Sequence, residues 1–290
     1  MLTIGRYNIR SLVLDRFRLD GGAMFGSVPK TLWSRLIPSD EKNRIQLCCR
    51  VLVVEDGVNR ILIDFGMGRK WKEKEREIFS IESGSNASFQ ELIGTPTHIL
   101  LSHLHFDHTG GITSLNESGK PTLTFPSATV IVSKRNIEHA RTPGVRERAS
   151  YLAENIEPLL SADLSLTEDG DEVFPGISVH QFHGHTPGLQ GIRISDGGKS
   201  LWYPSDVIPT ANHIQVPYVM GYDLCAQTAM EEKHRLLDQI VADRSRIVFE
   251  HDDSTIGGTL TLGADKKYLL APDPELDALA LKERPSPSAD

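Results

Sequence analysis

The stretch His103-Leu104-His105-Phe106-Asp107-His108 places four side chains that can bind a metal within six positions. The preceding run, Ile99-Leu100-Leu101-Ser102, is apolar and predicts a buried strand that ends just before this hexapeptide. Residues that follow a strand pass into a loop at the edge of the sheet, where binding sites commonly lie. The spacing of His103 and His105 fits ligands that converge from a turn, because a helical pair would be three or four residues apart.

The hexapeptide is difficult to explain without a cation. The chain has 11 histidines in 290 residues, so three His and one Asp in this order arise by chance in roughly one such chain per thousand. Packed imidazolium groups would repel one another, and a buried unpaired charge is costly. A divalent cation binds neutral imidazole and ionised carboxylate together. We therefore interpret the hexapeptide as a metal-binding segment rather than a polar surface loop.

Three more side chains of the same kind occur later in the chain. They are His185, Asp206 and His251, and each comes at the end of an apolar or strand-like run. A single His after a strand is usually a surface or core residue. Because all three share their placement with the hexapeptide, we expect one site built along the edge of a sheet.

Taken in order, these motifs resemble the metallo-β-lactamase superfamily. The motifs are Leu62-Ile63-Asp64-Phe65-Gly66, His103-x-His105-x-Asp107-His108-Thr109-Gly110-Gly111, Gly184-His185-Thr186-Pro187-Gly188, Asp206 and His251. The resemblance implies an α/β fold, namely a four-layer αββα sandwich of two mixed β-sheets flanked by helices. It also implies a site for two metal ions. The implied ligands are His103, His105 and His185 for metal 1, Asp107, His108 and His251 for metal 2, and Asp206 as the bridge, with Asp64 behind them orienting a ligand.

The ligand set separates the branches of this superfamily. The β-lactamases usually lack the equivalent of His108 and use a Cys in the second site, and the flavodiiron proteins have Glu in place of His105. Hydroxyacylglutathione hydrolases, persulfide dioxygenases, tRNA 3′-processing nucleases and N-acyl homoserine lactonases all remain compatible with these ligands.

Further stretches are similar to the lactonase-like branch, which includes quorum-quenching N-acyl homoserine lactonases and methyl parathion hydrolases. These stretches are residues 20–26, 206–210, 220–223 and 249–252. One departure is Pro209, which stands where some lactonases carry a Tyr. The candidates for a phenol that contacts substrate are then Tyr218 and Tyr222.

The expected activity is that of a dinuclear metal-dependent hydrolase that opens a lactone or cleaves a related ester. Two divalent cations about 3.5–4 Å apart can share a hydroxide that acts as a nucleophile at neutral pH. Asp107 and Asp206 are the expected catalytic residues, and the lactonase resemblance gives Asp107 the transfer of a proton to the leaving alkoxide. The expected metal is Zn, although five His and two Asp suit Fe, Mn and Co as well as Zn.

Three alternatives remain. One is a phosphotriesterase-type hydrolase that uses the same site. Another is a persulfide dioxygenase with a single iron at His103, His105 and His185. The third, a non-catalytic metal-binding or regulatory module, is disfavoured because all seven ligand positions are filled.

Composition restricts the partners. Hydrophobic residues make up 39% and charged residues 24% of the chain, as in ordinary globular proteins. The net charge of −8 disfavours a nucleic-acid partner. No apolar run is long enough for a membrane helix, so the expected partner is a small ester or lactone.

Three Cys without a disulfide pattern and no signal peptide indicate a cytoplasmic protein. The sequence is also compatible with a homodimer.

We expect a single metallo-β-lactamase-like domain over residues 1–271, because ligands from 103 to 251 must meet in space. It would have an N-terminal extension or loop over about 1–45, and residues 272–290 would form a C-terminal tail. Residues 47–55 and 60–64 flank Asp56-Gly57, which predicts a hairpin.

Two further segments carry specific expectations. Residues 227–241 have apolar side chains near helical spacing and predict the best helix of the chain. The glycine-rich segment 21–30 is expected either to pack on the core or to cover the metal cleft. In the second case Met24 and Phe25 would contact an acyl chain.

Overall fold

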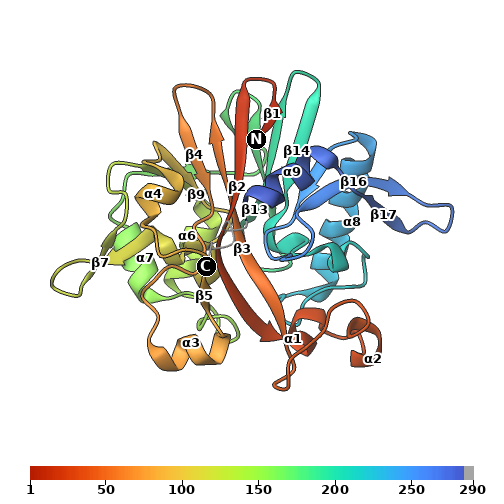
Figure 1. Cartoon of the computed structure of the whole chain (residues 1–290), viewed down its shortest axis with the longest axis horizontal. Helices are drawn as coiled ribbons and strands as arrows, with labels where there is room; N and C mark the ends of the chain where they lie inside the picture. Colours follow the sequence, from red (N-terminus) through yellow and green to blue (C-terminus); the bar gives the residue numbers. More distant parts are fainter. Residues whose placement is uncertain (284–290) are drawn as a thin grey trace, which may run out of the picture.

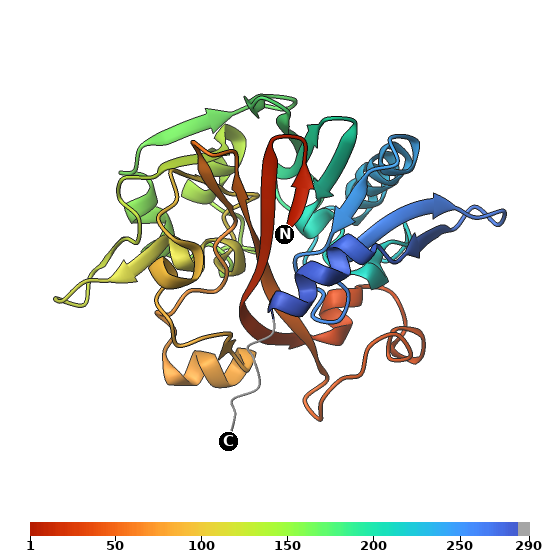
Figure 2. The same cartoon turned by 45° about the horizontal axis from the view of Figure 1, so that its top comes forward.

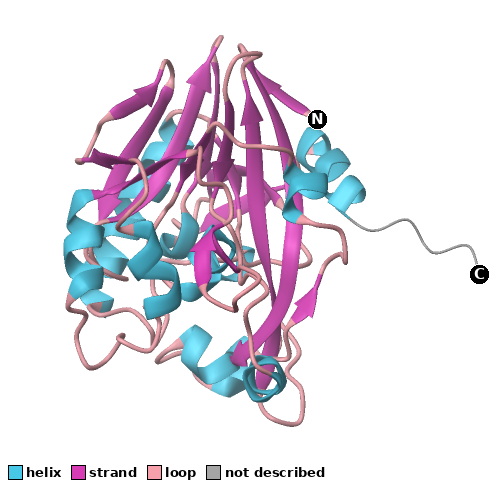
Figure 3. Cartoon of the chain, turned by 90° about the vertical axis from the view of Figure 1, so that its left-hand side faces the viewer, coloured by secondary structure: helices cyan, strands magenta, loops and turns pink. Residues whose placement is uncertain are grey.

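Two β-sheets face each other, and helices cover their outer surfaces (Figure 1). The structure is a computed structural model that describes residues 1–283. In Figure 3 the strands form the middle of the molecule, and most helices lie outside them. Both sheets contain parallel and antiparallel pairs. The predicted four-layer αββα sandwich of two mixed sheets is therefore confirmed.

The first sheet is antiparallel on one side and parallel on the other. Its strands, in spatial order, are β1 (Leu2–Ile4), β2 (Tyr7–Asp20), β3 (Arg44–Glu55), β4 (Arg60–Ile63), β6 (His98–Leu100), β9 (Thr129–Ser133) and β10 (Leu164–Thr167), with β5 (Glu82–Ser83) beside β2. Strands β3 and β4 pair antiparallel, with Glu55 opposite Arg60. The hairpin predicted across Asp56-Gly57 is confirmed.

The second sheet is antiparallel except where β14 and β15 run side by side in parallel. Its strands, in spatial order, are β11 (Glu172–Phe174), β12 (Ile177–Phe182), β13 (Leu189–Asp196), β14 (Lys199–Tyr203), β15 (Arg246–Val248), β16 (Gly257–Leu262) and β17 (Tyr268–Ala271). A separate small hairpin joins β7 (Thr113–Leu115) and β8 (Pro121–Leu123).

The main core lies between the two sheets. Successive side chains of a strand point to opposite faces. On β3, accordingly, Leu52 and Val54 face the inner core, whereas Val51 and Val53 face the outer helices. Both faces of this strand are buried, which explains why its sequence is a continuous apolar run rather than an alternating one.

Four of the helices within residues 1–283 cover the outer faces of the two sheets. The helices are α1 (Gly21–Phe25), α2 (Lys30–Trp33), α3 (Glu73–Phe79), α4 (Phe89–Ile93), α5 (Phe106–Thr109), α6 (Lys134–Arg141), α7 (Ala153–Leu159), α8 (Ala226–Ala242) and α9 (Pro274–Glu283), with 3₁₀ turns η1 (Gly110–Ile112), η2 (Ser205–Val207) and η3 (Ala211–His213). Helices α4, α6 and α7 pack on the first sheet, and α8 packs on the second. Helix α8 confirms the helix predicted over 227–241.

Both ends of the described chain contribute to the packed body. Strands β1 and β2 belong to the first sheet, and helix α9 lies beside β2 (Figure 2). Leu276 and Leu279 of α9 are buried in the inner core. The division of the chain at residue 271 stays a prediction, and residues 284–290 lie outside the described residues. No helix within 1–283 has the length and apolarity needed to cross a membrane.

Candidate metal centre

The predicted ligands meet at one edge of the sandwich because each follows a strand that ends there. Strand β6 of the first sheet leads into His103 and His105, and the short helix α5 then presents Asp107 and His108. In the second sheet, β12, β14 and β15 each end just before one ligand. These ligands are His185, Asp206 and His251, respectively. All seven side chains are buried.

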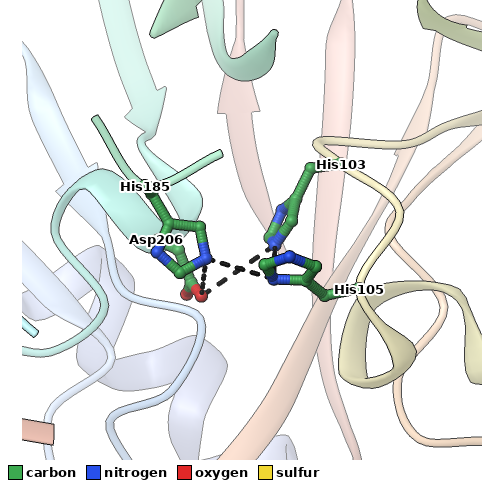
Figure 4. Close-up of side chains that lie close together, drawn as sticks. All are labelled: His103, His105, His185 and Asp206. Atoms are coloured by element: carbon green, nitrogen blue, oxygen red, sulfur yellow. Dashed lines mark hydrogen bonds and ion pairs between the residues drawn. The ribbon is translucent and has the colours of Figure 1, made fainter. Parts of the chain in front are cut away.

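Four of these residues form a first ligand group, drawn in Figure 4. Their ligand atoms, from His103, His105, His185 and Asp206, all lie within 4.8 Å of one another. His105 Nδ1 lies 3.0 Å from His103 Nε2 and 3.2 Å from His185 Nε2. This is the set predicted for metal 1, together with the predicted bridge.

The second ligand group consists of Asp107, His108 and His251, whose ligand atoms again lie within 4.8 Å of one another. His251 Nε2 lies 3.3 Å from His108 Nε2 and 3.7 Å from Asp107 Oδ2. Asp206 stands between the two groups. Its Oδ2 lies 3.2 Å from His185 Nε2, and its Oδ1 lies 3.1 Å from His251 Nε2.

The donor atoms fit a pair of divalent cations. Two ring nitrogens about 3 Å apart can share only one proton, and His105 Nδ1 faces two such nitrogens. Imidazole nitrogens and carboxylate oxygens are ordinary ligands for zinc and similar metals. A cation shared among the bare lone pairs would satisfy all of these atoms at once, which protons alone cannot do.

The local electrostatics favour the ligand forms of two side chains. Burial lowers the pKa of the His103 ring well below its usual range, and the neighbouring imidazoles lower it further. This shift favours the neutral form of His103, which is the form that binds a metal. Burial alone would raise the pKa of Asp206, but His251, His108 and His185 hold it well below the usual range, so this carboxylate is ionised.

Three of the ligand histidines also have a partner for the ring nitrogen that faces away from the two ligand groups. His185 Nδ1 lies 2.9 Å from Asp223 Oδ1, and His251 Nδ1 donates to the Cys48 carbonyl at 2.8 Å. His108 Nδ1 lies 3.1 Å from Asp64 Oδ2, so Asp64 occupies the place behind a ligand that the resemblance implies. Such contacts fix the tautomer and the orientation of a ligand ring.

Three acidic residues near the ligands were not predicted from the sequence. Glu250 Oε2 lies 3.0 Å from His108 Nδ1, and burial raises the pKa of this carboxyl to about 7. Asp223 contacts His185, and Glu147 lies behind His105. Glu250 and Asp223 have a signal in the sequence, because they lie in the stretches 249–252 and 220–223 that are similar to the lactonase-like branch, whereas Glu147 has none.

A cavity of about 500 Å³ opens over the two groups. Its floor and walls comprise His105, Asp107, His185, Asp206, His251, Leu19, Met24, Leu47, Phe79, Phe106, Met220, Gly221, Tyr222, Arg146, Glu147, Ala149 and Ser150. The floor is therefore made of five of the seven predicted ligands, and the walls are largely apolar.

The predicted substrate residues separate into two pairs. Met24 and Tyr222 line the cavity. Phe25 does not line it, because its ring is buried in a stack between Trp33 and His213, with centroid distances of 5.6 and 4.7 Å. Tyr218 packs edge-on against Phe25 and also lies outside the lining.

Comparison with known families agrees with this geometry. Residues 49–251 match the family described as "Metallo-beta-lactamase superfamily". The chain belongs to the metallo-β-lactamase superfamily. The matched region begins in β3 and ends on His251, so it contains the whole ligand set.

Proteins with sequences similar to this chain include N-acyl homoserine lactonases. One from a Bacillus species is 29% identical over 158 residues, which are 53% of this chain and 55% of the relative. N-acyl homoserine lactonase AiiA of Bacillus thuringiensis subsp. kurstaki is 30% identical over 158 residues, with the same coverage. The chain thus spans about half the length of the curated relatives it matches.

Solved structures share the fold over nearly the full length. A probable metal-dependent hydrolase from Staphylococcus aureus is 26% identical, with a TM-score of 0.82 over 94% of this chain and 99% of that one. AidC, a dizinc quorum-quenching lactonase solved with a product, is 19% identical, with a TM-score of 0.71 over 94% and 96%. The hydrolase AbOPH is 21% identical, with a TM-score of 0.74 over the same shares.

Proposed function

We propose that this protein is a dinuclear metal-dependent hydrolase that opens a lactone or cleaves a related ester. The observation that carries this proposal is the position of Asp206, whose two oxygens reach both ligand groups on the floor of an apolar cavity. The names of the N-acyl homoserine lactonase relatives support a lactone as substrate.

The ligand groups define which residues would hold each cation. One would be held by His103, His105 and His185 and the other by Asp107, His108 and His251, with Asp206 shared. When bound, a pair of divalent cations supplies a water nucleophile at neutral pH and stabilises the charge that develops on a carbonyl oxygen. We propose Zn as the cation. Fe, Mn and Co suit the same donors.

The remaining chemistry belongs to the protein's own side chains. Asp107 lines the cavity, so its carboxylate can take up a proton and deliver it to the leaving alkoxide. Tyr222 is 40% exposed at the cavity wall, and partial desolvation of its phenol raises the pKa to about 12, so the phenol stays protonated and can donate a hydrogen bond to a substrate oxygen. The apolar walls exclude water and bind the hydrocarbon part of the substrate.

Activity measured on metal-defined protein tests this function. The panel consists of homoserine lactones of increasing acyl length, aryl esters, phosphotriesters and, with oxygen present, a persulfide, assayed after the metal content has been measured. We expect two equivalents of divalent metal per chain and the highest kcat/KM for a lactone. One equivalent of iron with production of sulfite from a persulfide would instead establish the dioxygenase. Phosphotriesters as the fastest substrates would establish the phosphotriesterase.

A further inference from the structure

A buried carboxylate that belongs to neither ligand group lies behind His105. Glu147 is only 5% exposed and sits in the segment between α6 and α7. Its Oε2 lies 3.7 Å from His105 Nε2. No motif in the sequence marks this residue, and it is far along the chain from the hexapeptide.

The orientation of His105 explains why its outer nitrogen needs a partner. Its Nδ1 faces the nitrogens of His103 and His185, so a ring that uses Nδ1 as a ligand carries its proton on Nε2. This Nε2 is buried and has no partner within hydrogen-bond distance among residues 1–283. Tyr151 presents its ring edge-on at a centroid distance of 4.9 Å. The acceptor that faces Nε2 is therefore the carboxylate of Glu147, within reach of a small side-chain adjustment.

Other contacts hold Glu147 in this place. Thr186 Oγ1 donates to Oε2 at 2.9 Å, and His139 Nε2 contacts Oε1. Thr186 directly follows His185 and is also hydrogen-bonded to the Tyr151 hydroxyl at 2.7 Å. The carboxylate is thus fixed between α6 and the loop that carries another ligand, so it is pre-organised as an acceptor for His105.

We propose that Glu147 is a positioning residue that accepts the Nε2 proton of His105 and so holds Nδ1 toward the first ligand group. Asp223 has the equivalent contact with His185 Nδ1, at 2.9 Å. The two carboxylates come from two loops on the cavity wall, and Arg146 joins these loops by donating to the carbonyls of Gly221 and Asp223. The wall that contacts substrate therefore also orients two ligands of metal 1.

The inference rests on the proposed function only in requiring that the first ligand group binds a metal. Its test is metal binding rather than turnover. The variants are Glu147→Ala and Glu147→Gln, and the matched control is Glu154→Gln, which removes one charge from an exposed position on α7. Affinities for Zn²⁺ and Co²⁺ are measured by competition with a chromophoric chelator, and the visible spectrum of the Co²⁺-loaded protein reports the ligand geometry.

We expect Glu147→Ala to weaken the binding of one of the two metal equivalents by about 10–100-fold and to alter the Co²⁺ spectrum. The metal affinity of Glu147→Gln should fall between those of Glu147→Ala and wild type. The Gln amide keeps one acceptor oxygen, but its NH₂ group faces the hydrogen-bond donors Thr186 and His139. Glu154→Gln should match wild type.

Two outcomes separate the proposals. Wild-type protein that binds no divalent metal would overturn the proposed function and this inference together. Wild-type protein that binds two equivalents, with unchanged affinity and spectrum in both Glu147 variants, would overturn the role of Glu147 alone. If Glu147→Ala does not fold by circular dichroism, the nearly isosteric Glu147→Gln decides the question by the same readouts.

Discussion

Asp206 Oδ1 lies 3.1 Å from His251 Nε2, although the two residues belong to distant parts of the chain. They come together because β14 and β15 are parallel neighbours in the second sheet. Parallel strands deliver the residues after their carboxyl ends to the same edge. The same carboxylate reaches His185 with its other oxygen, so one side chain connects both ligand groups.

Replacing Asp206 by Asn should weaken metal binding by both ligand groups. The amide keeps one carbonyl oxygen but loses the charge and the second acceptor. We expect fewer than two equivalents of metal, measured by inductively coupled plasma mass spectrometry. We also expect a fall in kcat/KM for a lactone of at least about 100-fold. Asp265→Asn, on an exposed loop, serves as the charge control. Full metal content and full activity in the Asp206 variant would contradict its bridging role.

Two neighbouring residues of α1 should respond differently to truncation. Met24 lines the cavity, so Met24→Ala should raise KM about tenfold for long acyl lactones and leave short ones nearly unchanged. Phe25 is buried against Trp33 and His213, so Phe25→Ala should lower the free energy of unfolding by about 3–5 kcal/mol without such a length dependence. An equal dependence of KM on acyl length in both variants would count against this assignment.

Removing the metal should destabilise the fold. The two ligand groups bury five imidazoles and two carboxylates at close range, and a cation that binds only the folded state stabilises it. The gain is about 2.7 kcal/mol at a free metal concentration of 100 Kd. Thermal unfolding should therefore shift to lower temperature after chelation and recover when Zn²⁺ is added. The Asp206→Asn variant should show a smaller shift, and an equal shift would indicate that the metal binds elsewhere.

The free energy of unfolding should depend on pH through the buried carboxyl of Asp15. Burial raises the pKa of this carboxyl to about 7, although the Met67 amide donates to it at 3.1 Å. The folded protein then binds this proton more tightly than the unfolded chain, whose Asp titrates near 4. This group therefore costs stability as the pH rises from about 4 to about 7. Asp15→Asn does not titrate, so its stability relative to wild type should increase across this range.

The expected relative gain for Asp15→Asn is roughly 2–4 kcal/mol. Urea unfolding of the metal-free proteins at several pH values measures it, and the difference between the two proteins cancels the titration of the other groups. If the difference in the free energy of unfolding between the two proteins stays constant between about pH 4 and pH 7, burial does not raise the pKa of Asp15.

Much of this architecture could be predicted because the ligands lie directly after strands. A buried strand followed by His or Asp is a local signal, and seven such residues, five His and two Asp, in the order of the superfamily identified both ligand groups. Glu147 could not be predicted in the same way. It stands between Arg146 and Arg148, as an ordinary surface charge would, and only tertiary packing places it behind His105. Phe25 and Met24 are adjacent in sequence, so no pattern could show which of them faces the cavity.

The distribution of the ligands along the chain has a consequence for biosynthesis. His103 to His108 leave the ribosome early, but both ligand groups need Asp206, and the second also needs His251. A nascent chain therefore cannot complete both ligand groups until β11 to β15, five of the seven strands of the second sheet, have been translated. If the proposed cations bind, their capture is then a late step in the maturation of the protein.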